Sequence, residues 1–301
     1  MRVLITGNGG FIGSALTPRL TKDGHEIHGL RESECPLQNH EGVEAVIRAV
    51  NPEVVIHLAA KTEVALSFDN YREVSEVNYV GTVNLAEACR KFVPDFKLFC
   101  MASTMETYGN HDRRFGPFVE ETEQRPAAPY AVAKLACEKY LAYMAYAYKF
   151  PSVIIRQTNA YGRPDNDFFV VERIISQMLR SDVCNLGAPD PWRNFLFIDD
   201  LVELYSRILS DPEIVIGETF VTGPNNALPI ADLAEMIGAL LAWRGELNWN
   251  TIPARPGEIY YLNSNPAKAE RVLGWEPRVR LTDGLERTIE MWRKKLAFVQ
   301  V

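Results

Sequence analysis

The chain has 301 residues, of which 47% are hydrophobic and 24% charged, and its formal net charge is −7. This balance is typical of a globular protein with one large domain or two unequal lobes, and the absence of a long Lys/Arg run argues against nucleic acid as a partner. No segment approaches the roughly 18 apolar residues of a membrane span, and the N-terminal apolar run is too short for a secretory signal, so we expect a cytoplasmic protein without a membrane partner.

The five cysteines, at positions 35, 89, 100, 137 and 184, form no CxxC pair, and the five histidines lack metal-ligand spacing. An odd number of scattered cysteines is typical of reduced thiols packed as small apolar groups. We therefore predict a protein with no metal site.

The first half of the chain alternates short β-branched runs with longer helical patterns, which indicates parallel βαβ units. Strands are predicted over 2–6, 24–30, 54–58, 97–102 and 152–156, and helices over 11–23, 43–50, 78–92 and 129–150. The expected fold is α/β, with a Rossmann-type doubly wound parallel sheet.

After about residue 160 prolines and glycines become frequent, as in GRPDN, GAPDP and TGPNN. This change predicts a first lobe over 1–158 and a smaller C-terminal α/β lobe, mainly for substrate, over 159–301. We expect segments near 190–225 to return to the first lobe.

The first predicted strand is followed by GNGGFIG at 7–13, directly before a helix. Glycines let the backbone turn sharply and approach a pyrophosphate, which would lie at the helix N-terminus. In this context the motif predicts dinucleotide binding by Gly7, Gly9, Gly10, Phe11, Ile12 and Gly13.

The second predicted strand is followed by Arg31, Glu32 and Ser33. An acid is expected here when the cofactor ribose carries a free 2′-hydroxyl, whereas a cation and a hydroxyl suit a 2′-phosphate. Arg31 and Ser33 therefore favour NADP over NAD, and the alternative is that Glu32 serves as the acid.

Tyr130 and Lys134 are four residues apart and share one face of a predicted helix. An ammonium near a phenol lowers its pKa, so Tyr130 is expected to exchange a proton with an alcohol while hydride moves to or from a nicotinamide. Thr104 follows a buried strand, at the sheet edge where ligands bind in such folds.

With these motifs the chain closely resembles the extended short-chain dehydrogenase/reductase superfamily, in its nucleotide-sugar epimerase/dehydratase branch. The resemblance rests on GNGGFIG at 7–13, HLAAKT at 57–62, NYVGT at 78–82, STMETYG at 103–109, YAVAK at 130–134, RQTNAYG at 156–162, RNFLFIDDLV at 193–202, ARPGE at 254–258 and LGWEP at 273–277. It implies a nucleoside-diphosphate sugar as substrate and a homodimer formed between helices, for which the tyrosine-rich stretch 140–148 is a candidate surface.

The resemblance also implies roles for individual residues. Tyr130 matches the redox acid/base, Lys134 its partner, and Thr104 the group that bonds the 4-oxygen of the sugar. Further cofactor contacts are expected at Leu37, Leu58, Ala59, Ala60, Lys61, Asn78, Ala102 and Thr158, and substrate contacts at Asn159, Arg193 and Arg255.

Met105 and Glu106 bear on the reaction. In the 4,6-dehydratases of this branch an Asp and a Glu follow the Thr; the resemblance assigns leaving-group protonation to the Asp and C5 proton removal to the Glu. Met105 cannot donate a proton, which disfavours an ordinary 4,6-dehydratase, whereas Glu106 remains a candidate C5 acid/base.

The leading hypothesis is thus NAD(P)-dependent redox chemistry at C4 of a nucleotide sugar, of the epimerase/dehydratase type. An NADPH-dependent 4-keto-6-deoxy nucleotide-sugar reductase and a non-catalytic dinucleotide-sensing regulator are the alternatives. The nucleotide base, the sugar and its stereochemistry stay open.

Overall fold

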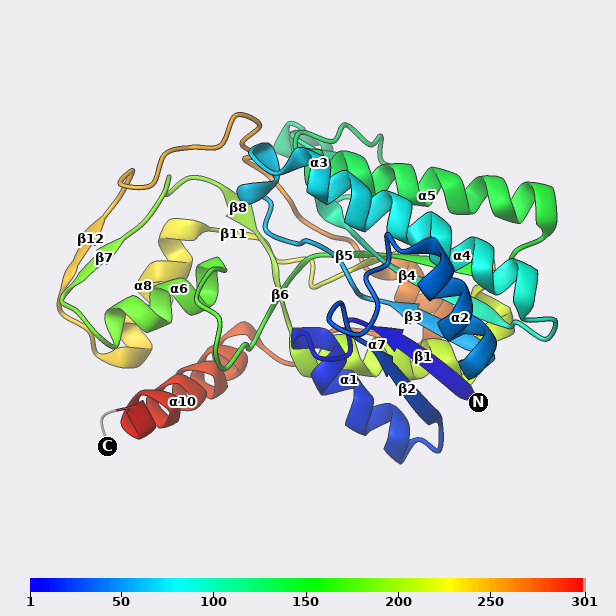
Figure 1. Ribbon diagram of the computed structural model, residues 1–301. Coiled ribbons are helices and arrows are strands. Elements are labelled where there is room, and N and C mark those ends of the chain that lie inside the picture. The colour runs from blue at the N-terminus through cyan, green and yellow to red at the C-terminus, as the bar shows by residue number, and fades with distance from the viewer. Residues whose placement is uncertain (300–301) are drawn as a thin grey trace.

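The computed structural model describes residues 1–299 and contains a six-stranded parallel sheet between two layers of helices (Figure 1). The sheet order is β10-β5-β4-β3-β1-β2. Its strands are β1 (Arg2–Thr6), β2 (Glu26–Leu30), β3 (Val54–His57), β4 (Leu98–Thr104), β5 (Ser152–Gln157) and β10 (Thr219–Thr222). The predicted α/β class with a doubly wound parallel sheet is confirmed.

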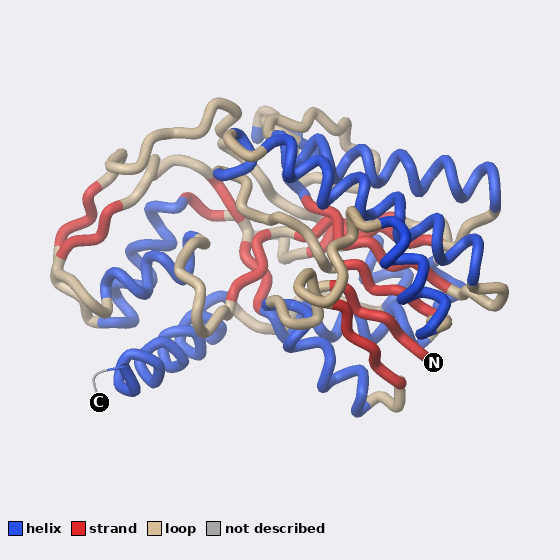
Figure 2. The backbone as a smooth tube through the Cα atoms, viewed as in Figure 1, coloured by secondary structure: helices blue, strands red, loops and turns tan. Residues whose placement is uncertain are grey.

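Alternate residues of each strand face opposite layers of helices, as the period of two requires. Val3 and Ile5 pack on the side of α1 (Phe11–Lys22) and α7 (Ile198–Ser210), whereas Leu4 packs on the other side. The second layer consists of α2 (His40–Val50), α4 (Gly81–Phe92) and α5 (Pro129–Tyr148), and Figure 2 shows the strands enclosed between these layers. Because both faces are covered, the strands are nearly continuous apolar runs.

The helix predicted over 78–92 begins earlier than expected. A continuous helical stretch starts with α3 (Tyr71–Val74), passes through a π-helical segment at Ser75–Val80 and continues as α4. Asn78 therefore lies inside this stretch and not at a helix start. The polar sequence NYREVSE before it carries little apolar periodicity, which is why the pattern did not reveal these turns.

The C-terminal half forms a second group of elements, seen at the left of Figure 1. Three two-stranded sheets pair β11 with β8, β12 with β7 and β6 with β9. The elements are β6 (Asn159–Tyr161), α6 (Val170–Met178), β7 (Val183–Asn185), β8 (Trp192–Arg193), β9 (Phe195–Phe197), β11 (Leu228–Pro229), α8 (Ile230–Leu241), β12 (Glu246–Asn248) and α10 (Leu281–Val299). The helix α9 (Ala267–Leu273) lies apart from this group and packs against β10 and α7.

Two elements from the C-terminal half lie against the first half: α7 contacts α1, and β10 pairs with β5. The division into 1–158 and 159–301 stays a prediction. Within residues 1–299, none of the helices combines the length and apolar character that a bilayer crossing requires.

Candidate dinucleotide and substrate site

The order of the sheet places a crevice at the carboxyl ends of β1 and β3. β1 lies between β2 and β3 in the sheet, so the connection from β1 to β2 runs in one direction and the connection from β2 to β3 runs back past β1. In open α/β sheets this reversal is where ligands bind.

The glycine turn lies at this crevice. Gly7 has φ +73°, and a Cβ there would lie 2.9 Å from the backbone nitrogen of Ala59, so a side chain is excluded on both grounds. Gly10 is the N-cap of α1 and supplies no side-chain cap, so the backbone N–H groups of Phe11, Ile12 and Gly13 open the helix as a site for an anion. Asn8 turns back, and its side chain lies against Gly29 of β2.

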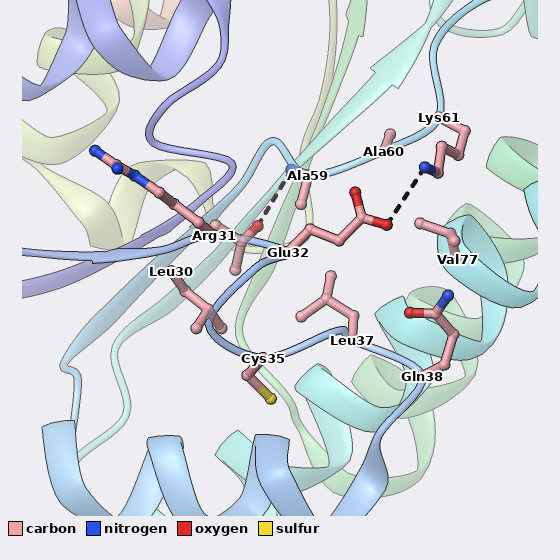
Figure 3. A pocket seen from close by; sticks show the side chains of 11 residues that line it. Leu30, Arg31, Glu32, Cys35, Leu37, Gln38, Ala59, Ala60, Lys61 and Val77 are labelled. Atoms are coloured by element: carbon pink, nitrogen blue, oxygen red, sulfur yellow. Dashed lines mark hydrogen bonds and ion pairs between the residues drawn. The ribbon is translucent and has the colours of Figure 1, made fainter.

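A pocket follows the turn, between the segments after β1, β2 and β3 (Figure 3). Five predicted cofactor residues line it: Arg31, Leu37, Ala59, Ala60 and Lys61. Sequence reasoning missed Thr6, Leu30, Cys35, Gln38 and Val77, and it gave Glu32 only as an alternative. The position of Thr6 at the end of the first predicted strand was the available signal. Ser33 is exposed and is not among the lining residues, contrary to prediction.

Glu32 and Arg31 point in different directions. Figure 3 shows the Glu32 carboxylate directed toward Lys61, with Oε1 3.3 Å from Nζ, while the Arg31 guanidinium extends away from the other labelled side chains. The Arg31 side chain lies against Gly9. A carboxylate inside the pocket suits a ribose hydroxyl and repels a phosphate.

Lys61 joins three segments of the pocket wall. Its ammonium pairs with Glu32 and with Glu73 at 3.2 Å. Its backbone N–H donates to Asn78 Oδ1 at 2.8 Å, and Asn78 Nδ2 donates to the Lys61 carbonyl at 3.0 Å. Asn78 thus shapes the pocket by fixing residue 61.

A second group of side chains converges beyond the end of β4. Thr104, the last residue of that strand, accepts a hydrogen bond from the backbone N–H of Glu106 at 3.2 Å. Tyr130, the second residue of α5, is buried near the Thr104 hydroxyl and the Glu106 carboxylate, and both groups influence the pKa of its phenol. Three of the four predicted catalytic residues therefore meet at one place.

The fourth, Lys134, is buried one turn further along α5. Its Nζ donates to the Ala102 carbonyl at 2.8 Å, and burial lowers the pKa of its ammonium. We expected Lys134 to lower the pKa of Tyr130, but burial, reinforced by the Glu106 carboxylate, raises the pKa of this phenol. The Tyr130 hydroxyl is consequently protonated at neutral pH in this environment.

Glu106 faces two arginines from the C-terminal half. Burial lowers the pKa of Arg193, and the Glu106 charge only partly opposes this effect. For Arg255 burial is outweighed by the carboxylates of Glu258 and Glu106, which raise its pKa. Arg255 also pairs with Glu258 at 2.9 Å, and Arg193 Nη2 donates to the Ile259 carbonyl at 2.7 Å. Within residues 1–299, Glu106 Oε2 is buried without a hydrogen-bond partner. Glu258 was missed as a site residue, although ARPGE was noted as a motif.

Met105 contributes packing and not chemistry. Its side chain is 1% exposed and belongs to a buried cluster with Tyr108, Phe118 and Tyr261. The 3₁₀ turn over Met105–Tyr108, which follows β4 directly, thus directs Glu106 to the site and Met105 to the core.

The remaining predicted residues lie between these groups. Leu58 is half-buried directly after β3. Thr158 and Asn159 follow β5, and both donate to the Asn194 carbonyl, at 3.1 and 3.2 Å. Asn194, next to Arg193, thereby ties the chain after β5 to the arginine group.

Comparison with known proteins agrees with this geometry. Residues 3–223 match the family described as "NAD dependent epimerase/dehydratase family". The UDP-glucose 4-epimerase of Mycolicibacterium smegmatis is 30% identical, covering 98% of this chain and 99% of that protein. A mouse dTDP-D-glucose 4,6-dehydratase is also 30% identical, over 97% of this chain and 89% of that protein.

Among solved structures, UDP-glucose 4-epimerase of Thermus thermophilus in complex with NAD superposes with a TM-score of 0.88. It is 27% identical, over 97% of this chain and 99% of that one. The prediction of NADP over NAD is therefore wrong, since the matched family is NAD dependent and the similar structure holds NAD. The physical reason is that both residues line the pocket, but the Glu32 carboxylate is directed across it toward Lys61, whereas the Arg31 guanidinium extends away from the other labelled side chains.

Proposed function

The chain belongs to the NAD dependent epimerase/dehydratase family, and from this premise we propose that it acts with NAD at C4 of a nucleoside-diphosphate sugar and exchanges the C5 proton through Glu106. It is an enzyme of that family. The observation that carries the proposal is the meeting of Thr104, Glu106 and Tyr130 at one place.

The dinucleotide fits the first group of residues. The backbone of the glycine turn suits the pyrophosphate, and Glu32 suits the ribose hydroxyls of NAD. Held by these residues, NAD would supply a hydride acceptor for C4 of the sugar, and its reduced form would supply the hydride for the reverse step.

Tyr130 is the group proposed to exchange the proton of the C4 hydroxyl. Thr104 lies near the phenol and would hold the 4-oxygen of the sugar, while the Lys134 ammonium donates to the Ala102 carbonyl on the same side of α5. The phenolate that accepts the alcohol proton needs a nearby cation, because burial alone raises the pKa of Tyr130.

Glu106 is proposed to exchange the proton at C5. Oxidation at C4 makes this proton acidic, because the resulting carbanion delocalises into the ketone. Its Oε2 atom, which has no hydrogen-bond partner among residues 1–299, is available for the proton, and Arg193 and Arg255 lie on the same side of the site.

Arg193 and Arg255 are proposed to bind the diphosphate of the substrate, for which guanidinium forks are well suited. They come from the C-terminal half, whereas the pocket assigned to NAD is formed by residues before 78. We accordingly propose that 1–158 binds the dinucleotide and 159–301 mainly the sugar nucleotide.

The proposal is tested by incubating the protein with NAD and a panel of UDP- and dTDP-sugars in D₂O. Deuterium should enter C5, and Glu106→Gln should slow this exchange by about 10²–10⁴-fold, because a positioned acid/base contributes that much. Mass spectrometry and proton NMR of the recovered sugar measure the exchange.

Glu123→Gln is the matched control, since Glu123 is an exposed carboxylate paired with Arg125. It should leave exchange unchanged. Turnover without deuterium at C5 would remove Glu106 from the mechanism, and the absence of turnover of every sugar by the wild-type protein would refute the substrate class. Reduction of a 4-keto sugar without C5 exchange would instead support the reductase.

A further inference from the structure

His57, the last residue of β3, has no role in the mechanism above, yet both of its ring nitrogens are bonded in the protein interior. The side chain is fully buried. Nδ1 lies 2.8 Å from Thr6 Oγ1, and Nε2 lies 2.9 Å from Thr82 Oγ1. The ring thus connects the end of β1 with α4.

The neighbouring bonds fix which nitrogen carries the proton. The Thr82 hydroxyl donates its only proton to the Asn78 carbonyl at 2.5 Å, so it must accept from His57 Nε2–H. Nδ1 is then the acceptor and takes the Thr6 proton, and Thr6 Oγ1 in turn accepts from the Ala59 N–H at 3.2 Å. The hydrogen bonds thus form one chain with a single donor-to-acceptor direction, which starts at the Ala59 N–H and ends at the Asn78 carbonyl.

The protonation state agrees with this assignment. Burial and the charge of Lys134 lower the pKa of His57 to about 3, so the ring is neutral at neutral pH. A neutral imidazole has one donor and one acceptor, as the series requires.

Both ends of the series are in the wall of the dinucleotide pocket. Thr6 and Ala59 line it directly, and Asn78 holds the backbone of Lys61, which also lines it. We propose that His57 is a positioning residue for NAD: through Thr6 and Thr82 it holds the two sides of the pocket at a fixed separation. This inference rests on the proposed function for the identity of the ligand.

Thr82 provides the test, because it does not line the pocket and reaches it only through His57 and Asn78. Thr82→Val keeps the shape of the side chain but leaves the buried Nε2–H without an acceptor. A buried donor without an acceptor is unfavourable, and relaxation of the pocket wall toward it should raise the dissociation constant for NADH by about fivefold or more. Fluorescence titration of the full chain with NADH measures this constant.

The matched control is Thr288→Val on α10. Thr288 is equally buried, and its hydroxyl also donates to the carbonyl four residues earlier, at 2.7 Å from Gly284 O. It should lower the melting temperature without changing NADH affinity. Thr82→Ser, which keeps the hydroxyl, should restore near wild-type affinity, and Thr82→Ala replaces the valine variant if that one does not fold.

Equal NADH affinity of Thr82→Val, Thr288→Val and the wild type would overturn the inference, whatever their melting temperatures. So would a loss of affinity that Thr82→Ser does not restore. A wild-type protein that binds neither NADH nor NAD would refute the proposed cofactor itself, which is a separate failure.

Discussion

Met105 and Glu106, which follow β4 directly, lie in environments of opposite polarity. Glu106 lies among charged and phenolic groups, whereas Met105 is enclosed by aromatic rings. The spacing of Thr104, Tyr130 and Lys134 predicted a common site. The burial of Met105 could not be predicted, because the rings around it come from positions 108, 118 and 261.

At the same scale, His57 determines part of the response to acid. Its pKa falls from 6.5 to about 3 on folding, so the unfolded chain takes up a proton that the folded ring does not. The free energy of unfolding should therefore decrease as pH falls from about 6.5 toward 3, by up to about 1.4 kcal/mol per pH unit from this one group. Above pH 6.5 the His57 ring is neutral in both the folded and the unfolded chain, so it should not make the free energy of unfolding depend on pH.

The comparison is between wild type and His57→Gln in urea unfolding at several pH values. The stability difference between them should shrink as the solution is acidified. Parallel curves over this range would show that His57 titrates normally in the folded protein.

At the scale of elements, a buried ion pair joins α5 to β5. Arg156 Nη2 lies 2.8 Å from Glu138 Oε2, both side chains are under 10% exposed, and Ser103 donates to the same carboxylate. Arg156 Nη1 also donates to the Tyr108 hydroxyl at 2.9 Å. The pair therefore holds the strand end that carries Thr104.

Arg156→Met should destabilise the protein by about 3–5 kcal/mol, because it leaves a buried carboxylate unpaired. The double variant Glu138→Gln/Arg156→Met should lose less than the sum of the two single variants. Arg114→Met, in the exposed pair with Asp112, should leave the free energy of unfolding essentially unchanged, because water screens this pair. Additive single effects in chemical denaturation would contradict the coupling.

Elements with regular apolar periodicity were predictable, and those shaped by side-chain hydrogen bonds were not. The strand patterns around Leu4, Val55 and Phe99 gave the sheet, because residues buried on both faces are almost uniformly apolar. The π-helical segment at Ser75–Val80 has no such signature. The directions of the Arg31 and Glu32 side chains depend on a turn in which the Glu34 carboxylate accepts a hydrogen bond from the Arg31 backbone N–H. The sequence pattern does not reveal this turn, and for that reason it led to the wrong cofactor.

For the whole molecule, the exposed side of α5 is a candidate dimer surface. Tyr146 is 86% exposed, and Tyr143 and Tyr148 are 47% exposed. Tyr140, predicted with them, instead donates to Glu87 at 2.9 Å and belongs to the contact with α4. Aromatic rings with polar tips suit such an interface.

We expect the wild-type protein to scatter light as a dimer and Tyr146→Glu to scatter as a monomer. The added charge would lose its hydration in the interface, which is unfavourable. Phe115→Glu, at another highly exposed aromatic position, should remain dimeric. A monomeric wild type, or a dimer unaffected by the charge at 146, would rule out this surface.

The contact of Asn8 with Gly29 has a consequence for how this sequence can diverge. A methyl group at residue 29 would come within 2.0 Å of Asn8 Nδ2, so even alanine cannot be accommodated while the asparagine keeps its place. Substitutions at these two positions must therefore occur in a fixed order. Asn8 must first be replaced by a smaller residue or change its side-chain conformation, and only then can Gly29 be replaced by a larger residue. Descendants of this chain with a larger residue at 29 should carry either a smaller residue at 8 or an Asn8 side chain turned away from β2.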